Sequence, residues 1–394
     1  MQGNETMTGS QIADTAITTS SFYRDDKKIT RRKTITLTVV IVIVSLLSLS
    51  LGNDDSGTPL MRYYSPADVA NVLWTAIYLG FGHLCNLPYV AQSDQIIDAV
   101  GCYHDVLGRA QTIGIVLVCG MLLAVSGMLF QMVFKNAIAS PTMLGVSSGV
   151  KLGQIIAVLI FSSAILKMPA VIYALGYLGG LIALAIVLLI GKLTGGSGKG
   201  SFNLLNMMLI GAMFSEVIGI FLTFLSATAL KGDLGKVYDQ IVLTTSLNKT
   251  PLAIMVLVVT AIVTIIPLIA RRYQLNLLAF SDTDIKLGGV NPSSIRILAL
   301  ACGSVMILAA QSEVGDVAML SLVTPFLSRA IFGVEFRKQF IGSVLIGMII
   351  ILVCSDISAM IQFVSTGVPM TVIVNVLMVP LFAWIMATNQ KALQ

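Results

Sequence analysis

Two ionisable residues stand out because they interrupt long apolar segments. Lys151 follows Gly145 and Gly149 and precedes Gly153 in "LGVSSGVKLG", and Glu216 lies in "GAMFSEVIGI". A charge within an apolar helix is unfavourable, so it often marks the route of a ligand or an ion. Lys151 could attract an anionic ligand; alternatively, its stem follows the helix and its ammonium group extends to a more polar region. We favour the second interpretation for Lys151.

A second candidate site combines both histidines of the chain with two cysteines. His83 and His104 lie close in sequence to Cys85 and Cys102. Imidazole and thiolate groups bind metal ions or haem, but this set lies in a long polar connection, and we expect no metal site and no cofactor there. Whether Cys85 and Cys102 form a disulfide stays open, since disulfides persist only in an oxidising compartment.

The segment "GGSGKGS" at 195–201 looks like a phosphate-binding loop but lacks its spacing. The Walker pattern requires glycine five residues before its Gly-Lys pair and serine or threonine after it. Leu193 and Gly200 occupy these two positions. The chain also lacks an HExxH motif, and we expect no catalytic residues and no enzyme activity.

The elements that position these residues follow from composition. The chain has 394 residues, of which 56% are hydrophobic and 11% charged, whereas soluble domains carry roughly 25% charged residues. We therefore predict an all-α integral membrane protein with about ten spans of some 20 apolar residues each. The predicted spans are 34–52, 110–134, 143–162, 169–191, 204–230, 251–270, 295–311, 317–333, 340–358 and 369–388.

Basic segments alternate with these spans and indicate their orientation. "RDDKKITRRK", Lys135, "GKLTGGSGKG", "ARRYQ" and "FRK" all fall on one side, which the positive-inside rule assigns to the cytoplasm. Both termini are then cytoplasmic. We expect a disordered cytoplasmic tail over 1–33, a transmembrane domain over 34–390, and an extracytoplasmic loop over 53–109 with a short helix after Ser65 and Pro66.

The spacing of glycines predicts close helix packing. Gly145, Gly149 and Gly153 recur at every fourth residue, and Gly176 and Gly180 repeat the spacing. Residues four apart share one helix face. Removing their side chains lets two membrane helices approach closely.

Four blocks of the chain resemble one family. "GMLLAVSGMLFQMVFKNAIASPTMLGVSSGVKLG" (120–153) closely resembles a stretch of the FecCD-type permeases, which import iron siderophores, haem and cobalamin. "LLAFSDTDIKLGGVNPSSIRILAL" (277–300) resembles the cytoplasmic segment between their sixth and seventh spans. "GDVAMLSLVTPFLSRAIFG" (315–333) and "GVPMTVIVNVLMVPLFAWIM" (367–386) resemble two later motifs, with departures at Ser321 and Phe326.

The resemblance implies a type II ABC importer permease fold in a bacterial cytoplasmic membrane. It also implies two permease copies or paralogues around a central path, two separate ATPase subunits, an extracytoplasmic substrate-binding protein, surrounding membrane lipid and no nucleic acid. The cytoplasmic segment 271–294 would couple the permease to its ATPase. We expect the coupling residues to be Ser281, Asp282, Asp284, Lys286, Leu287 and Gly288, with Ser281 as helix N-cap.

Further roles follow from the same resemblance. Binding proteins of this family dock acidic residues on basic ones, for which Arg62, Arg109, Lys231 and Lys236 are the candidates. Lys151 and Glu216 are candidates for the translocation path. The expected cargo is a ferric siderophore, with haem or cobalamin as alternatives. An ion-driven secondary transporter is the competing class.

Overall fold

The structure, a computed structural model, describes residues 9–52, 62–63, 67–75, 103–161, 169–193, 204–228, 251–361 and 370–388. These residues are almost entirely helical, which confirms the predicted all-α class. The long helices are α1 (Gly9–Leu49), α4 (Tyr103–Phe134), α5 (Val146–Phe161), α6 (Pro169–Leu193), α7 (Leu204–Thr228), α9 (Pro251–Ala270), α12 (Pro292–Val314), α13 (Ala318–Phe332), α14 (Phe336–Ile361) and α15 (Met370–Thr388).

The described helices match the predicted spans in order. Seven are long and apolar enough to cross a membrane, and α5, α13 and α15 are three shorter apolar helices. Two of the short ones begin after an irregular turn. The 3-10 helix η2 (Pro141–Leu144) and the left-handed Gly145 (φ 73°) precede α5, and Gly315 (φ 71°) precedes α13. These backbone breaks shorten the regular part of each span.

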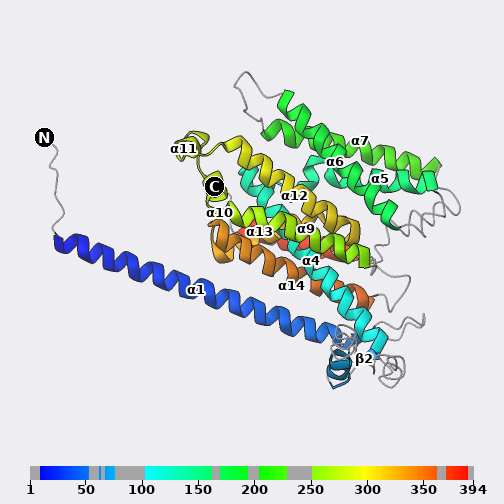
Figure 1. Cartoon of the computed structure of the whole chain (residues 1–394), viewed down its shortest axis with the longest axis horizontal. Coiled ribbons are helices and arrows are strands. Elements are labelled where there is room, and N and C mark those ends of the chain that lie inside the picture. The colour runs from blue at the N-terminus through cyan, green and yellow to red at the C-terminus, as the bar shows by residue number, and fades with distance from the viewer. Residues whose placement is uncertain are drawn as a thin grey trace, which may run out of the picture.

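Helix α4 forms the centre of the bundle and packs against α9, α12, α13 and α14 (Figure 1). In the 18-residue apolar window of α4, 78% of the residues are buried, whereas 11% are buried in the corresponding window of α1. Close backbone contacts hold this centre together. A Cβ added at Gly127 would lie 1.7 Å from the carbonyl oxygen of Ser321, so α4 and α13 touch along their backbones. Such contacts drive association where lipid already solvates apolar surface.

Helix α1 covers part of the segment 1–33, for which the expected disordered tail stays a prediction. The structure describes it as helical from Gly9, and it extends well past the other helices (Figure 1). Neither glycine nor proline occurs between residues 10 and 51, so nothing in the sequence ends the helix there. The hydroxyls of Thr34, Thr36 and Thr38 each donate to the carbonyl four residues earlier.

The segment between α1 and α4 is described only in part. Strands β1 (Leu51–Gly52) and β2 (Arg62–Tyr63) pair antiparallel, and residues 67–75 form the short helix expected in this loop. Cys85, Cys102 and His83 and the side chain of His104 lie outside the described residues. The disulfide therefore stays an open question, and the absence of a metal site stays a prediction.

The glycine spacing corresponds to an actual helix contact between α5 and α6. A Cβ at Gly149 would lie 2.6 Å from the Gly179 carbonyl oxygen, and one at Gly153 would lie 2.0 Å from the Leu175 carbonyl oxygen. A Cβ at Gly180 would lie 2.0 Å from the Leu308 side chain of α12, and one at Gly176 would lie 3.3 Å from the Gln154 side chain.

Gly145 differs from Gly149 and Gly153 in its backbone, although it too has a close neighbour, since a Cβ there would lie 2.9 Å from the Phe214 ring of α7. It precedes α5 and has a left-handed backbone, φ 73°, so it ends the turn η2 instead of lying on a helix face. Its positive φ favours glycine whatever its neighbours are. The turn still approaches α7 closely, because a Cβ at Gly211 would lie 2.2 Å from the Met143 carbonyl oxygen.

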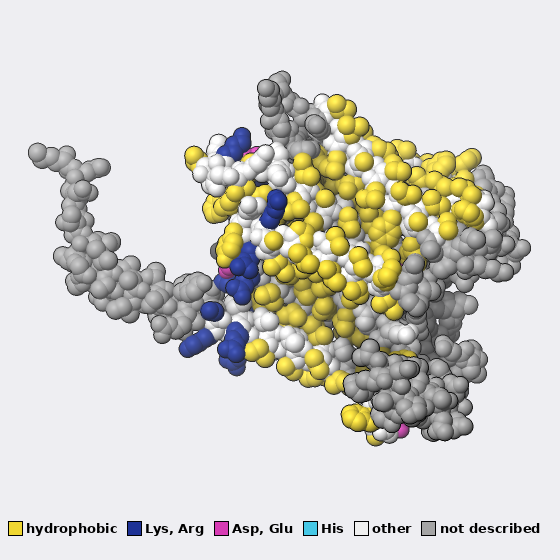
Figure 2. Space-filling view, viewed as in Figure 1, with side chains coloured by type: hydrophobic (Ala, Val, Ile, Leu, Met, Phe, Trp, Pro, Cys, Tyr) yellow, Lys and Arg dark blue, Asp and Glu magenta, His cyan; other side chains and the backbone are white. Residues whose placement is uncertain are grey.

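The surface divides into a broad apolar zone and a basic end. Figure 2 shows Lys and Arg side chains gathered at the end that carries α10 (Arg272–Asn276) and α11 (Asp282–Leu287), with apolar side chains over most of the remaining face. This distribution is the one expected of a membrane-embedded bundle with one basic, water-facing end.

Candidate functional site

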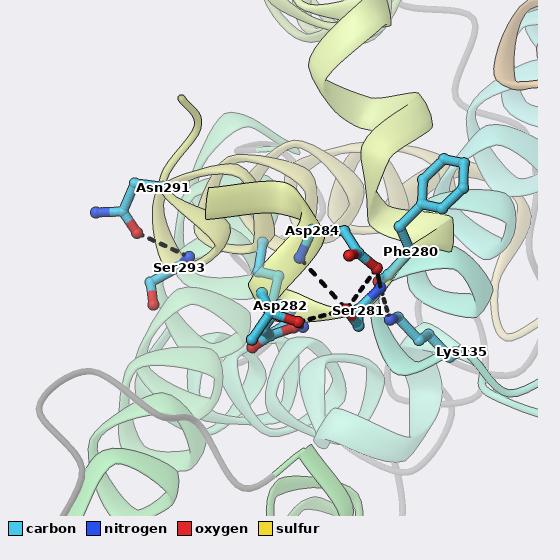
Figure 3. A network of polar contacts seen from close by, with 9 residues as sticks. Lys135, Phe280, Ser281, Asp282, Asp284, Asn291 and Ser293 are labelled. Carbon is cyan, nitrogen blue, oxygen red and sulfur yellow. Dashed lines mark hydrogen bonds and ion pairs between the residues drawn. The ribbon is translucent and has the colours of Figure 1, made fainter. Parts of the chain in front are cut away.

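The short helix α11 carries the residues expected to couple the protein to a partner. Ser281 is its N-cap: its hydroxyl oxygen accepts a hydrogen bond from the Asp284 amide at 3.3 Å. The Asp284 carboxylate in turn accepts from the amide of Ser281 at 3.3 Å and from its hydroxyl at 2.6 Å (Figure 3). The Gly288 amide donates to the Asp284 carbonyl and closes the helix. This reciprocal cap stabilises a helix that is otherwise too short to persist.

Asp282 fixes α11 to the membrane bundle. Its carboxylate accepts two hydrogen bonds from the guanidinium of Arg296, one of them at 3.0 Å, near the start of α12. Arg296 is buried, with 7% of its surface exposed, whereas Asp282 is half-exposed. The hydrogen bonds from Arg296 lower the pKa of Asp282. A bidentate pair of this kind holds two elements in a fixed orientation.

A second contact fixes the segment that precedes α11. The Lys135 ammonium, just beyond the end of α4, donates to the carbonyl oxygen of Phe280 (Figure 3). Beneath α11, Ile285 is fully buried. The segment is therefore bound both to α4 and to α12.

The outer side of α11 presents apolar groups to solvent. Leu287 is 87% exposed and Phe280 is 56% exposed, and Lys286 is exposed beside them. Exposed apolar side chains on a rigid helix at the water-facing end of a membrane protein indicate a protein interface. The predicted coupling residues thus lie together on one short helix, and their role in docking stays a prediction.

Lys151 lies next to a partner that sequence analysis did not identify. Its ammonium donates to Asp316, in the link between α12 and α13, at 2.9 Å. Gln311 donates to the other carboxylate oxygen at 3.2 Å and to the hydroxyl of Ser147 at 2.8 Å. The side chains of Lys151 and Asp316 are 36% and 34% exposed, so the ion pair lies at the surface of the single chain.

The ion pair lies far from the basic end, just beyond the last residue of α12. Lys33 donates to the carbonyl of Ile331, so the last turn of α13 belongs to the basic end. The rise from Ala318 to Arg329 along α13 is about 17 Å, and Asp316 precedes Ala318. Along α12, which starts at the basic end, the rise from Pro292 to Val314 is about 33 Å, so Asp316 lies beyond the middle of a hydrocarbon layer of ~30 Å. The ion pair therefore faces lipid, a second protein or a polar path.

The other candidate residues lie apart from this pair or outside the described part of the chain. Glu216 is exposed on α7. Arg62 belongs to β2, but its side chain is not described, and Lys231 and Lys236 lie outside the described residues. Among the described residues, no three His, Cys, Asp or Glu side chains gather as a metal site requires.

Arg109 corrects the expectation of an exposed docking residue. It is 5% exposed and forms an ion pair with Asp356 of α14. It also donates to the hydroxyl of Ser48 in α1 at 3.1 Å. A buried guanidinium needs such partners, and here it links α1, α4 and α14. It is therefore unavailable to a docking protein.

Comparisons with known proteins agree with this architecture. The model of the FecCD transport family matches residues 97–388. The chain belongs to the FecCD transport family. This assignment confirms the resemblance that the four sequence blocks indicated.

The individual relatives are 20% to 28% identical to this chain. A probable iron chelatin transport system permease protein of Helicobacter pylori is 28% identical over 71% of this chain and 80% of its own length. A probable heme-iron transport system permease protein of Staphylococcus aureus is 25% identical over 72% of this chain and 82% of its own length. A solved structure described as an inward-facing conformation of a putative metal-chelate type ABC transporter covers 92% of this chain and 99% of its own, with a TM-score of 0.68 and 20% identity.

Proposed function

We propose that this FecCD-family chain is the permease subunit of an ATP-driven importer for a ferric siderophore. The observation that carries the proposal is α11, a capped and exposed helix fixed to the bundle through Asp282 and Arg296. Iron chelatin and heme-iron transport in the names of two relatives support the cargo class. ATP hydrolysis would take place in two separate ATPase subunits, so we expect no enzyme activity in this chain.

The contacts of α11 suggest how an ATPase could drive the permease. A push on the exposed side of α11 would reach Arg296 through Asp282, and Arg296 lies near the start of α12. The far end of α12 leads directly to Asp316, which contacts Lys151 on α5. A single rigid helix would therefore transmit the motion from the basic end to the membrane interior, as packed elements do in other switching proteins.

The Lys151–Asp316 pair supports a path next to a second permease copy. A partly exposed ion pair in contact with lipid would be unfavourable, since charged groups at this depth usually face a bundle interior or a water-filled cavity. A second copy or a paralogue that covers this surface would remove the lipid contact. Lys151 would then line the path beside Asp316, and an extracytoplasmic binding protein would deliver the cargo to it.

Uptake measurements test the cargo. Cells with and without this gene would receive radiolabelled iron as ferric siderophores or as haem, and labelled cobalamin in parallel. We expect loss of ferric siderophore uptake alone. Loss of haem or cobalamin uptake instead would keep the permease function and replace the cargo. Loss of none, in cells without a redundant permease, would contradict the proposal.

The competing class, an ion-driven secondary transporter, makes a different prediction. Such a carrier would transport without an ATPase and would stop when an uncoupler collapses the membrane gradient. In our proposal, uptake depends on the ATPase subunit, and substitution of the ATPase catalytic glutamate abolishes it. Uptake that survives this substitution but not the uncoupler would favour the secondary transporter.

A further inference from the structure

A cavity of about 390 Å³ lies between the first part of α1 and the start of α14. Its polar rim includes Lys27 and Arg31 of α1 and Arg337 and Lys338 of α14. Ile35 and Ile341 line it as well, each further along its helix toward the apolar zone. The cavity therefore changes from basic to apolar along its length.

We propose that this cavity binds the phosphate headgroup of an anionic phospholipid from the leaflet that borders the basic end. The charge balance of the cavity favours a phosphate. Of the described residues that line it, Glu335 is the only acidic one, and its carboxylate pairs with Lys338 at 3.3 Å. The remaining cations, Lys27, Arg31 and Arg337, give the cavity a positive potential. Arg groups bind phosphate oxygens with two parallel hydrogen bonds.

The depth of the cavity favours a lipid over a soluble anion. Lys27 and Arg31 belong to the basic stretch of α1 that directly precedes its apolar run, which begins at Ile35. Phospholipid headgroups occupy this level of a membrane, and basic pockets between membrane helices on the cytoplasmic side bind anionic headgroups. An acyl chain attached to the phosphate would lie past Ile35 and Ile341, which a free phosphate would leave uncovered.

The apolar side chains of α1 are only partly covered by the bundle, so a lipid can contact them. In the 18-residue apolar window of α1, 11% of the residues are buried. Ile35 and Val39 are about half exposed, at 52% and 49%. A lipid in the crevice beside α14 would cover part of this surface and hold the start of α1 against the bundle. This cavity lies on α1 and α14, away from α11, so lipid binding and partner docking use different surfaces (Figure 1).

Matched variants test the proposal on the full-length protein in detergent. Native mass spectrometry would measure binding of phosphatidylglycerol and of phosphatidylcholine. The variant Lys27→Gln/Arg31→Gln removes two charges from the cavity. The control Lys28→Gln/Arg32→Gln removes two charges from the same stretch of α1, at exposed positions that do not line the cavity. We expect the cavity variant to bind phosphatidylglycerol roughly 30-fold more weakly and the control to bind like the wild type.

A third variant reverses the sign of the effect. Glu335→Gln removes the negative charge that lines the cavity, so phosphatidylglycerol should bind several-fold more tightly, which a loss of folding would not produce. Equal binding of both lipids by the wild type, or equal loss in the cavity and control variants, would overturn the proposal. Competition by millimolar inorganic phosphate as effective as that by the lipid would also overturn it, in favour of a soluble phosphate site.

Discussion

The ion pair between Asp282 of α11 and Arg296 of α12 is expected to have a large effect on uptake. Asp282→Asn keeps the size of the side chain but leaves the buried Arg296 without its carboxylate. We expect this variant to fold and to bind its ATPase, but to show uptake reduced by about tenfold or more, because the link from α11 to α12 is weakened. The measurement is ATPase activity and uptake on the same preparation.

A charge swap controls for this result. Asp282→Arg combined with Arg296→Asp restores an ion pair between the same two helices, and we expect it to recover part of the lost uptake. Equal uptake in wild type and Asp282→Asn would contradict the role of this link.

The same residue predicts a pH dependence. Hydrogen bonds from Arg296 lower the pKa of Asp282 in the folded protein. A lowered folded pKa means that the stabilisation is present above the ordinary aspartate value of about 3.9 and is lost as the pH falls through the folded pKa. The protection factors of the α11 amides, which are corrected for the intrinsic pH dependence of exchange, should therefore stay constant between pH 8 and pH 5. They should fall only below about pH 4. Loss of protection near pH 6 would contradict this.

Lys151 and Asp316 make a separate prediction. Lys151→Met leaves Asp316 without its partner, and we expect it to lower stability by about 1–2 kcal/mol, between the values for exposed and buried pairs, and to reduce uptake. Lys151→Met combined with Asp316→Asn should recover the stability, since no unpaired charge remains, but not the uptake. Thermal unfolding and uptake separate the two effects. If Lys151 acted only by extending to the interface, Asp316→Asn alone would change neither quantity.

At the scale of single elements, the sequence predicts the helices well and their ends less well. The apolar runs are long, so each predicted span corresponds to a described helix. The start of α1 is hard to predict, because residues 9–33 are polar but include no glycine or proline after Gly9 that would end a helix. Gly145 was assigned to a helix face because spacing alone does not reveal a left-handed backbone.

Contacts between segments that are distant in the chain cannot be predicted from a single sequence. Spacing identified Gly149 but not its partner Gly179, and charge identified Lys151 but not Asp316. These pairs depend on how the helices are arranged in space. Arg109 was assigned to the exposed surface for the same reason, since a basic residue near a loop gives no sign of a buried partner on another helix. The α11 cap was predicted because it is local.

The contact between α5 and α6 predicts a difference between two glycines. Gly149→Leu would place a side chain against the Gly179 carbonyl, where even a Cβ would lie at 2.6 Å. We expect a loss of about 1–3 kcal/mol and a lower yield of folded protein. Gly219→Leu is the matched control, because a Cβ at Gly219 would have no neighbour within 4 Å. Equal thermal stability of the two variants would contradict the packing argument.

At the scale of the whole molecule, we expect the basic end to contact lipid headgroups, solvent and the ATPase. Figure 2 shows this end with basic groups beside an apolar surface. Leu287 extends from it and is 87% exposed, so it contributes little to the stability of the chain alone. We therefore expect Leu287→Asp to leave folding unchanged and to reduce co-purification of the ATPase by at least about tenfold, because apolar anchors dominate such interfaces.

Val334→Asp is the matched control for Leu287→Asp. Val334 is also an exposed apolar residue, at 73%, but it lies in the link between α13 and α14 and not on α11. If any loss of apolar surface at this end weakened the complex, Val334→Asp and Leu287→Asp would act alike. If α11 is the docking element, only Leu287→Asp removes the ATPase, while both variants keep the thermal stability of the isolated chain. Full retention of the ATPase by Leu287→Asp would place the partner on another part of the basic end.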